Sequence, residues 1–179
     1  HAYLPGYAWE ERLDQFSAET YEGSGWNFVE GYTQAGQPNL NSECGNVWGY
    51  AGSTGDVDWS WDYHQMINAF RKHPRIGGWL YTEHHDVINE WNGYYRYDRS
   101  EKETGLESFN GMTLNDLHAP IQITPDIDLC VDTKTGDAFE IPLWLSAFTD
   151  ELPASSFKLV AFLTWMDECG NEGRMDLGD

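Results

Sequence analysis

The sequence predicts an α/β fold followed by an all-β part, and two patterns in the chain support this prediction. A short strand ending at Glu43 is followed by a helical pattern up to about residue 73, and a second strand is predicted over 75–82. From residue 119 onward, short β-patterned runs follow one another without helices between them. The first order is typical of a helix-covered parallel sheet, and the second of a β-sandwich. The two parts are predicted to be residues 1–114 and 115–179.

Two helical patterns accompany the strands of the first part. A short helix is expected over 7–16, where Trp9, Leu13 and Phe16 fall on one face. Asp56 and Asp58 favour the start of a second helix, and Pro74 ends it. The apolar residues of this second helix recur at helical spacing and are expected to pack against a sheet; they are Trp59, Tyr63, Met66, Ile67 and Phe70.

The second part is predicted from four β-patterned runs. An irregular connection is expected over 103–118, and residues 132–137 favour a turn. Strands at this spacing, without helices between them, predict part of a sandwich. The four runs are 121–124, 126–131, 138–146 and 157–165.

Glu43 is the leading candidate for a catalytic residue. It stands at the end of the first predicted strand, where Gly45 indicates that the chain turns. In barrel enzymes the C-terminal ends of the strands face the substrate cleft, which is where a nucleophile or base is needed. Residues 45–55 are rich in glycine but lack the Gly-Lys-Ser/Thr ending of a phosphate-binding loop. Residues 45–55 are therefore expected to form a loop close to a cleft. Taken alone, Glu43 is more simply interpreted as a strand-end acid in a surface ion pair.

The composition excludes some classes of partner. Ten Lys and Arg residues against thirty Asp and Glu residues give a formal net charge of −20. Nucleic-acid binding depends on Lys and Arg contacts to phosphates, so no nucleic-acid partner is expected. No stretch approaches the roughly 20 apolar residues of a membrane-spanning helix, so no membrane partner is expected. Cys44, Cys130 and Cys169 have no zinc-binding spacing, and the sequence leaves open whether Cys130 and Cys169 pair.

Three segments, taken in their order and spacing, carry a family resemblance. They are Asn-Ser-Glu-Cys-Gly at 41–45, the stretch 78–102 that begins Gly-Trp-Leu-Tyr-Thr-Glu, and the opening His1-x-Tyr3. Together they resemble the nucleophile strand, the last barrel strand with its exit loop, and the sixth strand of family 2 glycoside hydrolases. That family includes β-galactosidases, β-glucuronidases and β-mannosidases, and Cys44 departs from its usual Tyr or Phe. The resemblance implies that residues 1–114 are the C-terminal portion of a (β/α)8 (TIM) barrel and that residues 115–179 belong to an immunoglobulin-like β-sandwich.

The resemblance implies a retaining exo-β-glycosidase that removes terminal sugars from oligo- or polysaccharides by double displacement. One carboxylate attacks the anomeric carbon while a second, roughly 5–5.5 Å away, protonates the leaving oxygen. Glu43 matches the nucleophile, whereas the family's acid/base glutamate would lie on a strand before His1. We therefore expect the chain to be part of a longer protein whose remaining segments are its partners. No cofactor is expected, and an extracellular or periplasmic location is expected.

Sugar contacts are expected around the ends of the two strands. Four polar residues follow the second strand, but adjacent residues seldom reach one ion and no further ligand stands at a zinc spacing, so no metal is expected. Aromatic faces can cover the apolar face of a sugar ring, although core packing is the plainer role for each of them. The candidate substrate-binding residues are Asn41, Trp48, Trp79, Tyr81, Glu83, His84, His85 and Asp86.

A second function of a different class stays open at this point. A carbohydrate-binding protein without catalytic activity could use the same scaffold, with Glu43 as a hydrogen-bonding residue. Binding needs no second carboxylate, so the acid/base residue separates the two functions. The sugar, the linkage and the presence of a homo-oligomer are not determined by the sequence.

Overall fold

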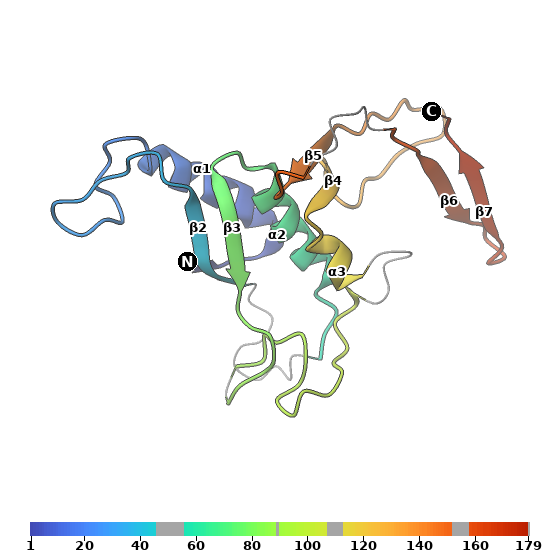
Figure 1. The fold of residues 1–179 in the computed structure, drawn as a ribbon. Helices are drawn as coiled ribbons and strands as arrows, with labels where there is room; N and C mark the ends of the chain where they lie inside the picture. The colour runs from blue at the N-terminus through green and yellow to red at the C-terminus, as the bar shows by residue number, and fades with distance from the viewer. Residues whose placement is uncertain (46–55, 89, 107–112, 152–157, 179) are drawn as a thin grey trace. The chain divides into compact units, whose positions relative to one another are not determined.

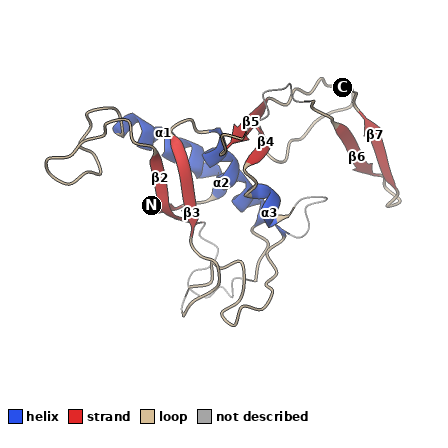
Figure 2. Cartoon of the chain, in the orientation of Figure 1, coloured by secondary structure: helices blue, strands red, loops and turns tan. Residues whose placement is uncertain are grey.

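The computed structural model describes residues 1–45, 56–88, 90–106, 113–151 and 158–178 (Figure 1). The contacts divide the chain into two compact units, His1–Phe148 and Thr149–Asp179. Figure 2 shows that all helices of the described residues belong to the first of these units. The expected domain boundary near residue 115 is not tested by this division and stays a prediction.

The first unit is built around a parallel three-stranded sheet. Its strands are β1 (Ala2–Tyr3), β2 (Asn39–Gly45) and β3 (Ile76–Tyr81), in the order β1-β2-β3. Both neighbouring pairs are parallel, with Ala2 opposite Cys44 and Cys44 opposite Tyr81. The predicted strands at Glu43 and over 75–82 are thus confirmed. Because all three strands point the same way, their C-terminal ends emerge at one edge of the sheet.

Helices connect these strands. A 3₁₀ turn η1 (Gly6–Ala8) leads into α1 (Trp9–Glu19) after β1, and α2 (Ser60–Lys72) connects β2 to β3. The predicted helices before and after the Glu43 strand are confirmed, and α1 extends a turn beyond the expected end. The apolar stripe of α2 forms the centre of the core, since the side chains Tyr63, Met66, Ile67 and Phe70 are 0% exposed.

A short helix and a hairpin complete the first unit. Helix α3 (Leu114–Leu117) lies within the connection predicted to be irregular, and β4 (Ile121–Pro125) pairs antiparallel with β5 (Leu143–Ala147). Arg71 on α2 donates hydrogen bonds to the carbonyls of Leu117 and Ala119, which ties the connection to the helix. The strand predicted over 126–131 is wrong. Bends interrupt the chain there, because Asp126 accepts hydrogen bonds from Lys72 and from Trp144 of β5.

Over the described residues of the second unit, β6 (Phe162–Met166) and β7 (Glu172–Asp176) form an antiparallel hairpin. Strand β6 lies within the predicted run 157–165 except for its last residue. Strand β7 was not predicted, because Glu-Gly-Arg-Met-Asp lacks apolar alternation. The described residues contain no closed barrel, so an eight-stranded barrel and a β-sandwich stay predictions. Over the same residues, no helix has the length and apolar character that a membrane crossing requires.

Candidate active site at the ends of two parallel strands

Glu43 is the third residue from the C-terminal end of β2, just before Cys44. Successive side chains of a strand point to opposite faces, and Cys44 is fully buried in the core beside α2. The carboxylate of Glu43 therefore points to the face away from that core. There the hydroxyl of Tyr3, at the end of β1, donates a 2.7 Å hydrogen bond to Glu43 Oε1. The parallel pairing of β1 and β2 produces this contact, since Tyr3 lies opposite Gly45.

The backbone of β2 is irregular just before this carboxylate. The register between β2 and β3 shifts between Asn41 and Cys44, and the amide of Glu43 donates a 3.1 Å hydrogen bond to Asn41 Oδ1. A local irregularity of this kind re-aims the side chains of a strand and is common beside functional sites. Asn41, expected to contact substrate, thus holds the backbone of the candidate nucleophile.

Cys44 has a structural role at this site. Its thiol is fully buried and donates to the carbonyl of Leu80, with a sulfur–oxygen distance of 3.2 Å. Burial raises the pKa of the Cys44 thiol to about 12, so the thiol stays protonated and does not act as a nucleophile. The carbonyl of Cys44 in turn accepts a hydrogen bond from the amide of Thr82, 2.8 Å away. This bond places the exit of β3 directly beside the end of β2.

The loop after β3 is fixed by a buried ion pair. Asp86 is 2% exposed, and its Oδ1 lies 2.7 Å from the ammonium of Lys102. Lys102 also donates to the carbonyls of Trp91 and Gly93, and the amide of Gly93 donates to Asp86 Oδ1 at 2.9 Å. Asp86 was expected to contact substrate, but every contact described for its carboxylate lies inside the loop. Lys102 is the last residue of the stretch 78–102 that carries the family resemblance, but nothing in the sequence predicted its ion pair with Asp86.

Glu83 is the second acidic residue close to the strand ends. Its Oε1 is buried without a hydrogen-bond partner among the described residues. Burial, followed by the nearby charges of Glu90 and Asp86, raises the pKa of the Glu83 carboxyl above its ordinary value. Glu83 therefore holds a proton at higher pH than an ordinary glutamate does.

The histidine pair lies in the same loop. The rings of His84 and His85 meet edge to face, with 5.7 Å between their centroids, and His84 also packs on Tyr95 at 5.2 Å. His84 is exposed and His85 is half-buried. Over the described residues, no group of three or more His, Cys, Asp or Glu side chains could hold a metal ion.

The candidate aromatic residues separate into two groups. Trp79 stacks on Phe70 with 5.4 Å between ring centroids, and Tyr81 packs on Trp59 and Tyr94, so both contribute to the core on the α2 side. The structure does not bring them to the face of Glu43. Trp48 lies outside the described residues. Tyr3 was expected to belong to a strand end. Its hydrogen bond to Glu43 was not predicted, because it depends on the register between β1 and β2.

Comparisons with protein-family models and with curated proteins find no match to this chain. The function is therefore inferred from the geometry around Glu43 and from the sequence resemblance.

Proposed function

We propose that this protein is a retaining exo-β-glycosidase that acts on terminal sugars of oligo- or polysaccharides, with Glu43 as its nucleophile. The proposal includes a (β/α)8 barrel, of which β1, β2 and β3 with their helices are the C-terminal portion, and a following β-sandwich. The observation that carries it is the 2.7 Å hydrogen bond between Tyr3 and Glu43 at the C-terminal ends of adjacent parallel strands. An acid in that position is what the chemistry of such a barrel requires.

The hydrogen bond from Tyr3 prepares the carboxylate for attack. It fixes Oε1 and thereby the plane of the carboxylate, while Oε2 accepts no hydrogen bond from another side chain of the described residues. In the first step, Oε2 forms a bond to the anomeric carbon and the glycosidic bond breaks. The leaving oxygen takes a proton from a second carboxyl group, which then activates the water that releases the sugar from Glu43.

The second carboxyl group is expected on a strand outside this chain, in line with the family resemblance. It would stand roughly 5–5.5 Å from Glu43, as retaining enzymes require. Residues at the mouth of the site come from the loop after β3, where the Asp86–Lys102 pair fixes the backbone that presents Glu83 and His84. These side chains would contact the hydroxyl groups of the sugar.

Replacement of the nucleophile tests the proposal. In the full-length protein, Glu43→Gln should keep the fold but lose several orders of magnitude in turnover of an activated aryl glycoside, because an amide is a poor nucleophile. A 2-fluoro sugar that traps the glycosyl-enzyme should add its mass to the wild type and not to this variant. The matched control is Glu140→Gln, which changes an exposed glutamate outside the sheet.

Two outcomes would reject the assignment. If Glu43→Gln hydrolyses the aryl glycoside at close to the wild-type rate, Glu43 is not the nucleophile. If the wild type binds sugars but neither hydrolyses them nor takes up the fluoro sugar, the protein is a carbohydrate-binding protein on the same scaffold.

A further inference from the structure

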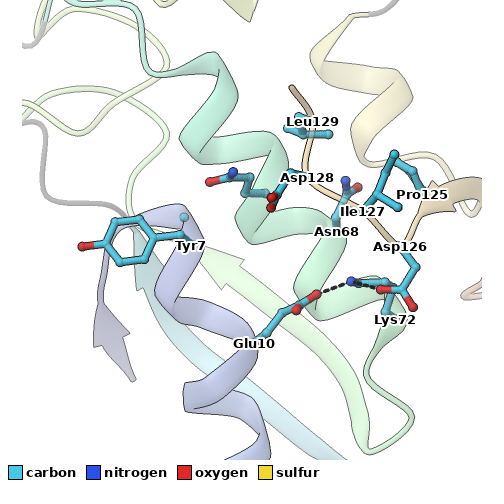
Figure 3. A pocket seen from close by; sticks show the side chains of 11 residues that line it. Tyr7, Glu10, Asn68, Lys72, Pro125, Asp126, Ile127, Asp128 and Leu129 are labelled. Carbon is cyan, nitrogen blue, oxygen red and sulfur yellow. Dashed lines mark hydrogen bonds and ion pairs between the residues drawn. The ribbon is translucent and has the colours of Figure 1, made fainter. Parts of the chain in front are cut away.

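Two cavities of the first unit differ in the charge of their walls. The first lies between η1, α2 and the chain after β4, where the ammonium of Lys72 is bound by the carboxylates of Glu10 and Asp126 (Figure 3). The second cavity, of about 370 Å³, lies between one face of α1, the loop that follows α1 and the first four residues of β2. None of the described residues that line it is Asp or Glu, although the chain has a formal net charge of −20.

Arg12 supplies a positive charge to the second cavity. It lies on the face of α1 that also carries Trp9 and Phe16, three positions before it and four positions after it. Its guanidinium makes no hydrogen bond and no ion pair with any described residue, in contrast to the paired ammonium of Lys72. Arg12 is also partly exposed, so a ligand in the cavity can reach it.

The polar groups on the walls leave donors rather than acceptors free. Four side-chain carbonyls of the loop and of β2 each accept a hydrogen bond from a neighbouring N–H group; they belong to Gln34, Gln37, Asn39 and Asn41. The side-chain nitrogen of Asn41, which is partly exposed, donates to no described residue. The five N–H donors of Arg12 are free as well. Free donors around a positive charge favour a carboxylate, which offers acceptors alone.

Aromatic rings form the apolar part of the walls. Phe16 and Trp26 pack edge to face, with 5.4 Å between their ring centroids. These two rings and that of Phe28 line the cavity, and all three residues are partly exposed. A flat apolar ring packs well against such a surface. The volume of the cavity lies within the roughly 300–1,000 Å³ that ligand pockets occupy.

We propose that this second cavity binds a small organic carboxylate that carries a flat aromatic ring. The guanidinium of Arg12 holds the carboxylate, since its planar fork can donate two parallel N–H bonds to the two oxygens. The aromatic ring of the ligand packs against Trp26 and Phe28. Glu43 does not line this cavity, so the site goes beyond the proposed glycosidase activity and does not depend on it.

Indole-3-acetate and indole-3-acetamide provide a matched pair of probes, because they have the same ring and differ by the charge of one group. Each is titrated into the full-length protein at about pH 7, where the carboxylate is ionised, and binding is measured by saturation-transfer NMR of the probe. Indole-3-acetate should bind with a Kd on the order of 1 mM, and indole-3-acetamide about fivefold more weakly. Sodium acetate, which lacks the ring, should not displace indole-3-acetate at an equal concentration.

The position of the bound probe is measured separately. At a saturating concentration of indole-3-acetate, hydrogen exchange followed by mass spectrometry should show slower exchange in the peptides that cover residues 9–16 and 24–42, because a ligand suppresses local opening of the segments that it contacts.

Two substitutions and two controls complete the test. Arg12→Gln should abolish the fivefold preference for the charged probe, whereas Arg12→Lys keeps the charge without the fork and should retain part of it. Phe28→Ala should weaken both probes equally and leave their ratio unchanged. The controls are Arg99→Gln and Phe139→Ala, which make related changes at exposed positions and should change neither affinity. Because the ratio is measured within each variant, a small loss of stability does not obscure it.

Four results would overturn the proposal. Equal binding of the two probes to the wild type would show that no positive charge is used. An unchanged ratio in Arg12→Gln would show that another group holds the carboxylate. Slower exchange confined to the peptides around residues 43 and 83–86 would place the probe at the candidate active site. No binding by the full-length protein would show that the cavity does not take such a ligand, as when another segment fills it.

Discussion

Two acidic residues at the strand ends of the same sheet stand in different surroundings. Glu43 near the end of β2 is half-buried, and within the described part of the chain its carboxylate accepts one side-chain hydrogen bond, from Tyr3. Asp86, beyond the end of β3, is 2% exposed and is bonded to both Lys102 and the amide of Gly93. The sequence presents both as acids after a strand. Among the described residues, the contacts of Asp86 hold a loop together, whereas Glu43 keeps one oxygen that accepts no hydrogen bond from another described side chain.

Lys102, the partner of Asp86, uses all of its hydrogen-bond donors. An ammonium has three donors, and Lys102 uses them on Asp86, the carbonyl of Trp91 and the carbonyl of Gly93. Burial of such a pair is tolerated where the protons and lone pairs find partners, and all three protons of the Lys102 ammonium do so here. Removal of one member should therefore affect stability strongly, while removal of the partner of Glu43 should affect it weakly. The three predictions that follow test this difference.

The largest effect is expected for Lys102→Met. Methionine keeps the length of the stem but leaves the Asp86 carboxylate buried without a counter-charge, which costs about 3–5 kcal/mol of unfolding free energy. Urea denaturation followed by far-UV circular dichroism measures this loss. The exposed Lys134→Met serves as the control and should stay within about 0.5 kcal/mol of the wild type.

A second variant tests the cause. Asp86→Leu combined with Lys102→Met removes both charges and should recover much of the stability, because no unpaired charge remains. If Lys102→Met alone costs less than about 1 kcal/mol, the ion pair does not hold the loop and the contrast with Glu43 disappears.

An intermediate effect is expected for Gly93→Ala. A Cβ at this position would lie 2.3 Å from the amide nitrogen of Asp86 and 2.4 Å from the carbonyl carbon of His85. These are backbone atoms, which cannot rotate away, so we expect a loss near the upper end of the roughly 1–3 kcal/mol that overpacking costs. The same urea denaturation measures it. Gly25→Ala is the control, since no atom lies within 4 Å of its added Cβ. Equal stability of both variants would show that the loop backbone adapts.

The sequence predicted the three-stranded sheet and its helices better than the chain after them, because these strands and helices have strong periodic patterns. The stripe from Trp59 to Phe70 identifies α2, and its burial follows directly from 3.6-residue spacing. The strand predicted over 126–131 is wrong because the hydrogen bonds of Asp126 to Lys72 and Trp144 are long-range and overrule a local β pattern.

Candidate site residues were less predictable, for a related physical reason. The order of residues along the chain places Glu43 and the 83–86 cluster near strand ends, which the structure agrees with. It does not indicate which partner each acid has, since Tyr3 and Lys102 reach their carboxylates across 40 and 16 positions, respectively. The sequence did not determine whether the aromatic residues contact substrate or the core. Trp79 and Tyr81 lie on the same side of the sheet, and α2 packs on that side and makes it the core side.

The smallest effect on stability, and the sharpest one on chemistry, is expected for Tyr3→Phe. Phenylalanine keeps the ring but removes the hydroxyl that donates to Glu43 Oε1, so the free energy of unfolding should fall by only about 0.5–1.5 kcal/mol. The carboxylate would then rotate more freely, and misplacement of a reacting group costs up to about a hundredfold in rate. The rate at which a 2-fluoro sugar labels Glu43 measures this loss directly, with the exposed Tyr32→Phe as the matched control. An unchanged labelling rate would show that the Tyr3 hydroxyl does not orient the nucleophile. A stability loss as large as that of Lys102→Met would show instead that both strand ends are held by equally strong internal contacts.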